Sequence, residues 1–92
     1  ADIAADVYSL GSTLFTMLAG GPAFTRRAEE ALAALFIRIM RDPVPDLRGR
    51  GVPDAVCRVV ELAMAKTPSE RPASASELGR QLQEVQRGLA CR

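Results

Sequence analysis

The stretch from Val7 to Phe24 contains no charged side chain, although 25% of the 92 residues in the chain are charged. Spanning a bilayer takes roughly 20 apolar residues, and hydroxyl residues and a glycine interrupt this shorter run. A helix that is apolar all round is normally buried among other elements. We therefore expect a buried helix and no membrane segment. Apolar residues occur on every side of that helix, at Val7, Tyr8, Leu10, Leu14, Phe15, Met17 and Leu18.

Both ends of this predicted helix carry stop or start signals. Asp6 stands near its beginning, where a short carboxylate can cap free backbone N–H groups and face the positive end of the helix dipole. Gly20 can take the left-handed conformation that closes a helix, and Pro22 cannot continue one. The helix is therefore expected over about residues 4–19.

Three amphipathic helices are predicted after it, at about residues 26–41, 53–66 and 75–89. Thr25 can cap the first of these, and its apolar positions 32, 35, 36, 39 and 40 have helical spacing. Pro53 suits the first turn of the next helix, and Ser74 with Glu77 has the form of a capping box before the last. No segment reads as a convincing strand. The predicted fold class is all-α, a four-helix arrangement with the apolar helix first and central.

Composition excludes several classes of function. A formal net charge of +1 gives no electrostatic case for nucleic acid or anionic lipid. The absence of histidine leaves little scope for metal sites or histidine-based acid–base chemistry. Cys57 and Cys91 are too few for the disulfide framework of a secreted mini-protein, and they fit a reducing, cytoplasmic compartment.

No residue pattern predicts an active site. The hydroxyl residues of the first helix have no neighbouring base that could activate them as nucleophiles. The segment around Gly49 and Gly51 lacks the lysine and hydroxyl residue that complete a phosphate-binding P-loop. Arg48 and Arg50 could bind a phosphate, but a solvated loop tip is the simpler interpretation. We expect no catalytic, cofactor-binding or metal-binding residue in this chain.

Three segments occur in the order and at the approximate spacing of a known family. Residues 6–11 (DVYSLG) resemble the start of the long central helix in the C-terminal lobe of eukaryotic-like protein kinases. Residues 18–24 (LAGGPAF) resemble the end of that helix, and residues 66–72 (KTPSERP) resemble a later segment that usually reads Asp-Pro-x-x-Arg-Pro. Thr67 stands where the family has aspartate. The bacterial serine/threonine branch is the most similar.

The resemblance implies a part of a catalytic domain. The glycine-rich loop, strand lysine, His-Arg-Asp loop and Asp-Phe-Gly metal site of kinases do not occur in this sequence. Residues 1–92 would then be the last four helices of the lobe, as the start at Ala1 without a methionine also suggests. The parent kinase would use ATP and Mg²⁺ to phosphorylate protein serine or threonine. The isolated chain is expected to be inactive.

Two residues take structural scaffold roles by the same likeness. Asp6 matches the aspartate that holds the backbone of the catalytic loop, and Arg71 matches the arginine that pairs with the glutamate of the Ala-Pro-Glu segment. A plain N-cap and a surface arginine are the alternatives. Breaking a buried ion pair is destabilising by about 3–5 kcal/mol, so we expect Arg71 to face solvent or to pair with Glu70 or Asp54.

The implied partners are the rest of the kinase domain and protein substrates or regulators. The first helix would lack the neighbours that bury it, so we expect the isolated chain to form a homodimer or a helix-swapped oligomer. The alternative function is an autonomous helical protein–protein interaction module that binds through the second helix, which in kinases often serves as a docking surface. A helix-turn-helix DNA-binding protein is disfavoured by the near-zero charge.

Overall fold

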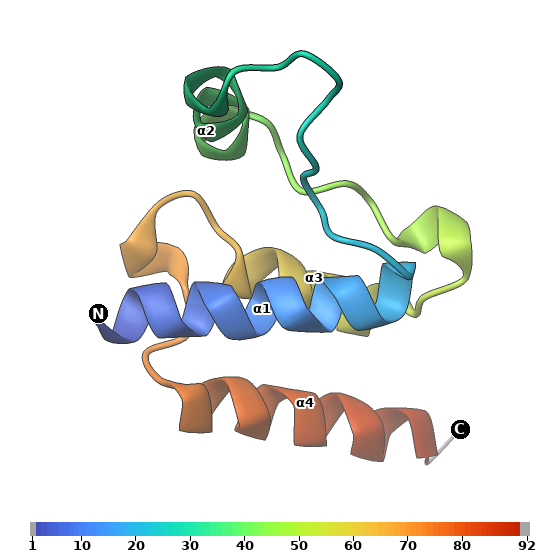
Figure 1. The fold of residues 1–92 in the computed structure, drawn as a ribbon. Helices are drawn as coiled ribbons and strands as arrows, with labels where there is room; N and C mark the ends of the chain where they lie inside the picture. Colours follow the sequence, from blue (N-terminus) through green and yellow to red (C-terminus); the bar gives the residue numbers. More distant parts are fainter. Residues whose placement is uncertain (1, 91–92) are drawn as a thin grey trace.

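The structure, a computed structural model, describes residues 2–90. Within that range there are four α-helices, two short 3-10 helices and no strand, so the predicted all-α class is confirmed. Figure 1 shows α1, α3 and α4 lying side by side, with α2 standing apart from them on two extended connectors. The elements in chain order are α1 (Ile3–Ala19), α2 (Leu32–Arg41), η1 (Arg48–Arg50), α3 (Asp54–Ala63), η2 (Pro68–Glu70) and α4 (Ala75–Ala90).

The first helix begins earlier than its sequence signal suggested. Asp2 is its N-cap, and one carboxylate oxygen accepts a hydrogen bond of 2.7 Å from the backbone N–H of Ala5. The assignment of Asp6 as a cap is therefore wrong, since Asp6 lies within the first turn. At the other end Gly20 adopts φ 79° and donates its N–H to the carbonyl of Thr16, as the glycine signal predicted.

The second helix starts at Leu32, six residues later than predicted, and Thr25 does not cap it. The intervening segment instead forms an irregular turn in which Glu29 has a left-handed φ of 65°. Glu30 stabilises this turn, because its carboxylate accepts the backbone N–H of Arg27 and the side chain of Arg38. A tertiary ion pair therefore overrides the local helical preference of this segment.

The last two helices lie close to their predicted positions. The third ends at Ala63 and not near 66, and Pro53 lies at its N-cap position, one residue before the predicted first turn, without a side-chain capping hydrogen bond. Ser74 Oγ accepts the N–H of Glu77 at 3.0 Å, which is the predicted first half of a capping box. The Glu77 carboxylate does not complete the box, because it binds Arg80 instead.

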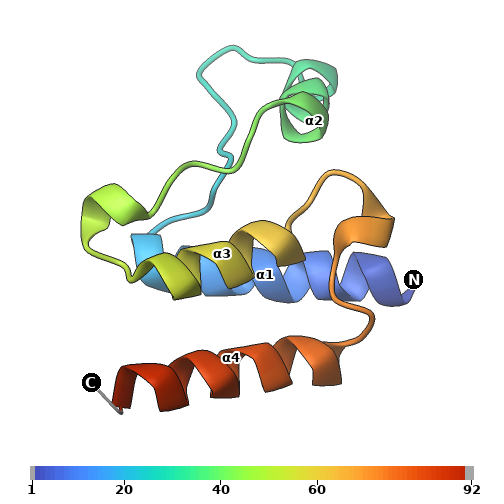
Figure 2. The ribbon, with the colours of Figure 1, turned by 180° about the vertical axis from the view of Figure 1, so that it is seen from behind.

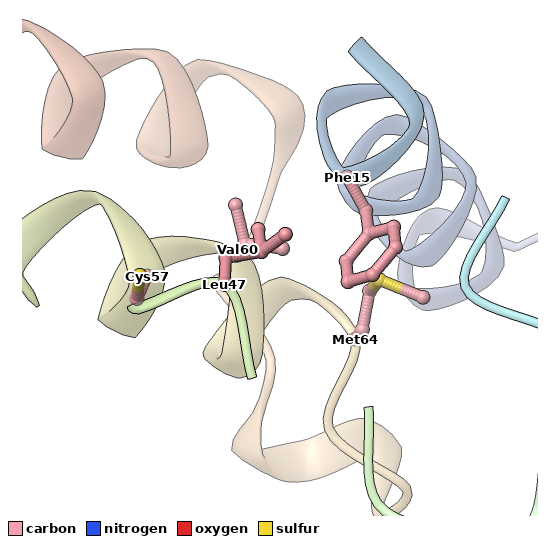
Figure 3. Packing of buried hydrophobic residues seen from close by; sticks show 5 residues of the cluster. All are labelled: Phe15, Leu47, Cys57, Val60 and Met64. Carbon is pink, nitrogen blue, oxygen red and sulfur yellow. The ribbon is translucent and has the colours of Figure 1, made fainter. Parts of the chain in front are cut away.

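Two buried clusters hold α1, α3 and α4 together, and α3 contributes to both. Burying a side chain of this kind contributes about 1.5–3 kcal/mol. Figure 3 shows the first cluster between α1, α3 and the loop before η1; it contains Phe15, Leu47, Cys57, Val60 and Met64. The second cluster, which includes the start of α4, contains Val7, Val59, Ala63 and Leu78.

Only one face of α1 is buried, so the expectation of burial on all sides is not met in this chain. Its buried positions are Val7, Gly11 and Phe15, each one turn from the next. Other apolar side chains of α1 stay exposed, notably Met17 at 75%. No helix of the described residues is long and apolar enough to cross a membrane.

Candidate functional site

Arg71 is half-buried at the junction between the start of α1 and the segment after α3. Its Nε donates to the carbonyl of Ala65 at 2.8 Å, and its Nη1 donates to the carbonyl of Ala4 at 3.0 Å. The guanidinium also lies over the ring of Tyr8, 4.9 Å from the centroid. The expectation that Arg71 faces solvent or pairs with an acidic residue is therefore wrong. Its guanidinium instead contacts two backbone carbonyls and the ring of Tyr8.

A groove opens beside Arg71, with a volume of about 500 Å³. Its walls come from α1 and α2, which face each other across it. Two cations, an aromatic pair and aliphatic side chains line it, so it suits a segment that is both apolar and acidic. The lining residues are Ala5, Tyr8, Ser9, Phe36, Ile39, Met40, Lys66 and Arg71.

Tyr8 forms part of that lining, and the charge of Arg71 affects the pKa of its phenol. Burial raises the pKa of the Tyr8 phenol above its ordinary value, and the nearby Arg71 charge opposes part of that increase. Resemblance to kinases assigned a role to Arg71 but none to Tyr8. The pairing joins residues 63 positions apart, so no local spacing could have predicted it.

Asp6 lies on the exposed side of the first turn of α1. Its backbone N–H donates to the carbonyl of Asp2, and its carboxylate makes no hydrogen bond or ion pair within residues 2–90. Arg71 binds the carbonyl of Ala4 in the same turn. The two residues assigned scaffold roles thus lie at the same end of α1.

Lys66 also borders the groove, and sequence analysis assigned it no role. Its Nζ donates to the carbonyl of Ile39 at 2.5 Å and lies 4.6 Å from the centroid of the Phe24 ring. Burial lowers the pKa of Lys66, and the charge of Asp42 opposes that decrease. One feature of the sequence distinguishes Lys66, since it is the one lysine among twelve basic residues.

The connector before α2 is attached to that helix by a shielded ion pair. Arg38 Nε lies 2.8 Å from a Glu30 carboxylate oxygen, and the two side chains are 19% and 10% exposed. Arg38 Nη2 also donates to the carbonyl of Thr25 at 2.6 Å. Hydrogen bonds from the Arg38 side chain and the Arg27 backbone lower the pKa of Glu30 to about 2.

The acidic residues near η1 surround Arg48. Its guanidinium contacts Asp46 at 3.1 Å, Asp54 at 2.6 Å and Glu61 at 2.7 Å, so the loop tip is tied to α3 and is not simply solvated. These carboxylates are occupied by one cation, and residues 2–90 contain no cluster of three potential ligands that could hold a metal ion. Arg48 thus occupies the carboxylates that a magnesium ion would need in this loop.

Of the two cysteines, Cys57 is buried and its Sγ donates to the carbonyl of Val52 at 3.6 Å. Burial raises the pKa of the Cys57 thiol, which keeps it protonated and unreactive. Cys57 is therefore a small residue of the hydrophobic core. Cys91 lies outside the described residues.

The chain is homologous to a short segment of bacterial serine/threonine-protein kinases. It is 50% identical over 84 residues to the serine/threonine-protein kinase PknK of Mycobacterium tuberculosis, an alignment that covers 91% of this chain and 8% of that protein. It is also 36% identical over 90 residues to PknB of Mycolicibacterium smegmatis, covering 97% of this chain and 14% of PknB. No model of a protein family matches the chain. The resemblance to kinases is thereby confirmed at the level of a homologous segment.

Proposed function

We propose that this chain is the helical platform at the end of the C-terminal lobe of a bacterial serine/threonine protein kinase. The parent would transfer the γ-phosphoryl group of ATP, with Mg²⁺, to serine or threonine of protein substrates. The observation that carries the proposal is the 50% identity to PknK across 91% of the chain. The platform itself would bind no nucleotide, since the kinase motifs that hold ATP and Mg²⁺ do not occur in its sequence.

The groove beside Arg71 supports this assignment. Two of the Arg71 nitrogens are bound to carbonyls, and Nη2 makes no hydrogen bond within the described range. A carboxylate from another part of the kinase domain can meet that free nitrogen, which fits the pairing with the Ala-Pro-Glu glutamate. Ion pairs of this kind are strongest when partly shielded from water. Asp6, exposed and unpaired in residues 2–90, would likewise hold the catalytic loop.

The first test is the genomic sequence that encodes the residues before Ala1. His-Arg-Asp and Asp-Phe-Gly should occur there, and their absence would overturn the assignment. The second test uses the kinase that contains this chain, with Arg71→Ala compared with Arg87→Ala on the exposed side of α4. Phosphorylation of a protein substrate should fall at least tenfold for Arg71→Ala only. Equal activities for the two variants would remove Arg71 from its scaffold role.

A second function has its own supporting observation. The side of α2 that carries Leu32, Phe36, Ile37 and Met40 is exposed, at 68%, 63%, 51% and 59%. Exposed apolar strips of this kind mark protein–protein contacts. We propose that α2 is a docking helix for protein substrates or regulators. The platform would work with the rest of the kinase domain in the cytoplasm, where free thiols such as Cys57 persist.

A further inference from the structure

The segment that carries α2 behaves as one unit. Arg38 on the helix binds Thr25 and Glu30 on the connector before it, so residues 24–42 are joined into an arm. None of the residues of α2 is buried, and α1 forms the opposite wall of the groove that α2 lines. Figure 2 shows the arm from behind, again separated from the layer of α1, α3 and α4. The position of the arm therefore depends on contacts other than buried helix packing.

Lys66 contacts this arm at each of its ends. Phe24 lies on the connector that enters α2, Ile39 lies in the last turn, and Asp42 follows the helix. The Lys66 ammonium bonds to the Ile39 carbonyl, lies against the Phe24 ring and is attracted by the Asp42 charge. Lys66 itself belongs to the segment between α3 and η2, which directly follows a helix of the α1, α3 and α4 layer.

The Ile39 carbonyl needs such a donor. Within a continuing helix its partner would be the N–H of residue 43, but that residue is Pro43, which has none. A cation at the C-terminal end of a helix also interacts favourably with the helix dipole. Lys66 therefore serves as the C-terminal cap of α2, supplied from 27 residues away.

We infer that Lys66 is a positioning residue that clamps the α2 arm over the groove and sets which apolar face α2 presents. The functional meaning of this clamp rests on the proposed docking role of α2. Its test measures the protection of the α2 backbone amides and not partner binding, so the clamp can fail while the docking proposal stands. Loss of the ammonium would free the last turn of α2 and let the arm move away from α1.

The experiment is amide hydrogen exchange, resolved by segment, on the whole 92-residue chain. Lys66→Met keeps the length and apolar character of the stem but removes the donor and the charge. Exchange in α2 should become about tenfold faster in this variant, while exchange in α4 should be unchanged. Lys66→Arg restores a cationic donor, so it should return α2 to within about threefold of the parent chain.

A matched control is Arg41→Met, which removes a cation from the last turn of α2 but leaves the clamp in place. It should change α2 exchange by less than about threefold. An equal acceleration in Arg41→Met would show a general dipole effect, and a parallel acceleration of α2 and α4 in Lys66→Met would show general destabilisation. Either result overturns the inference, as does an unchanged α2 in Lys66→Met.

A second measurement needs no variant and covers the case in which Lys66→Met fails to fold. Lys66 is the only lysine, so an amine-specific reagent modifies a single side chain besides the α-amino group, and peptide mass spectrometry separates the two products. The reaction of Lys66 in the native chain should be at least tenfold slower than in the urea-unfolded chain, since the ammonium is bound and partly buried. Equal rates would show that the clamp does not form in solution and would overturn the inference.

Discussion

Gly11 of α1 and Ala63 of α3 lie so close that a Cβ placed on Gly11 would stand 2.7 Å from the Cβ of Ala63. The same Cβ would meet Met64 Cγ at 3.0 Å, and both neighbours are fully or almost fully buried. The close approach of α1 and α3 therefore depends on a residue without a side chain. Gly11 lies in the middle of the buried face of α1, between Val7 and Phe15.

Gly11→Ala should destabilise the chain by about 1–3 kcal/mol, the usual range for forcing extra volume into a packed core. The gain in helix propensity of about 1 kcal/mol is included in that net figure. Gly79→Ala on α4 is the matched control, since nothing lies within 4 Å of the added Cβ. That variant should be neutral or stabilising. Urea unfolding checks both, and equal stabilisation by the two changes would contradict the close packing.

Arg71→Met should raise the pKa of Tyr8 further, because the apolar replacement keeps the ring covered while removing the attractive charge. Tyr8 is the only tyrosine and the chain has no tryptophan, so phenolate absorbance follows this residue alone. Because the pKa of Tyr8 is higher in the folded state than its ordinary value of 10.0, the contribution of Tyr8 to the free energy of unfolding is fully present below pH 10. This contribution is lost as the pH rises through the folded-state pKa of Tyr8. A Tyr8 titration that does not move in Arg71→Met would exclude the contact.

The connector before α2 should loosen in acid. The folded-state pKa of Glu30 is about 2, below its ordinary value of 4.5, so its stabilising contribution is present above pH 4.5 and is lost as the pH falls toward 2. The carboxyl carbon-13 shift of Glu30 should titrate with a midpoint near 2. Glu30→Gln should weaken the turn at neutral pH and abolish this pH dependence. A midpoint near 4.5 would mean that the pair with Arg38 is not formed.

Self-association of the isolated chain should run through α2. Phe36→Lys puts a charge in the middle of the exposed apolar strip, whereas Ala34→Lys puts the same charge on the Arg38 side of the helix. Light scattering at high concentration should report dimers or larger species for the parent chain and for Ala34→Lys. The Phe36→Lys chain should be largely monomeric. A monomeric parent chain would exclude both the dimer and the helix-swapped oligomer.

Local patterns were sufficient for much of this fold. The Gly20 stop, the Ser74 cap and the helical spacing of apolar residues each act over four residues or fewer, so they place helices without tertiary information. They could not place the start of α2, because Glu30 is held by Arg38 eight positions later. The assignment of Asp6 as a cap failed for a similar reason, since Asp2 offers the same chemistry one turn earlier.

The groove was less predictable than the helices. Arg71 was singled out only by resemblance to kinases, and its actual acceptors, the carbonyls of Ala4 and Ala65, carry no side-chain signature. The Lys66 contact with the Ile39 carbonyl has the same character. Contacts to backbone atoms across long stretches of chain depend on how the helices pack, and sequence periodicity does not contain that information.

The Lys66 clamp holds α2 at Ile39, so a rotation about this point displaces the other end of the helix the most. The pivot lies near one end of the helix, and Leu32 lies seven residues away, which is about 10 Å at 1.5 Å per residue. A rotation of about 10° at the pivot would carry the Leu32 end through roughly 2 Å, enough to separate side chains that were in van der Waals contact. A small displacement at the Lys66 ammonium group is thus amplified at the Leu32 end of the apolar strip.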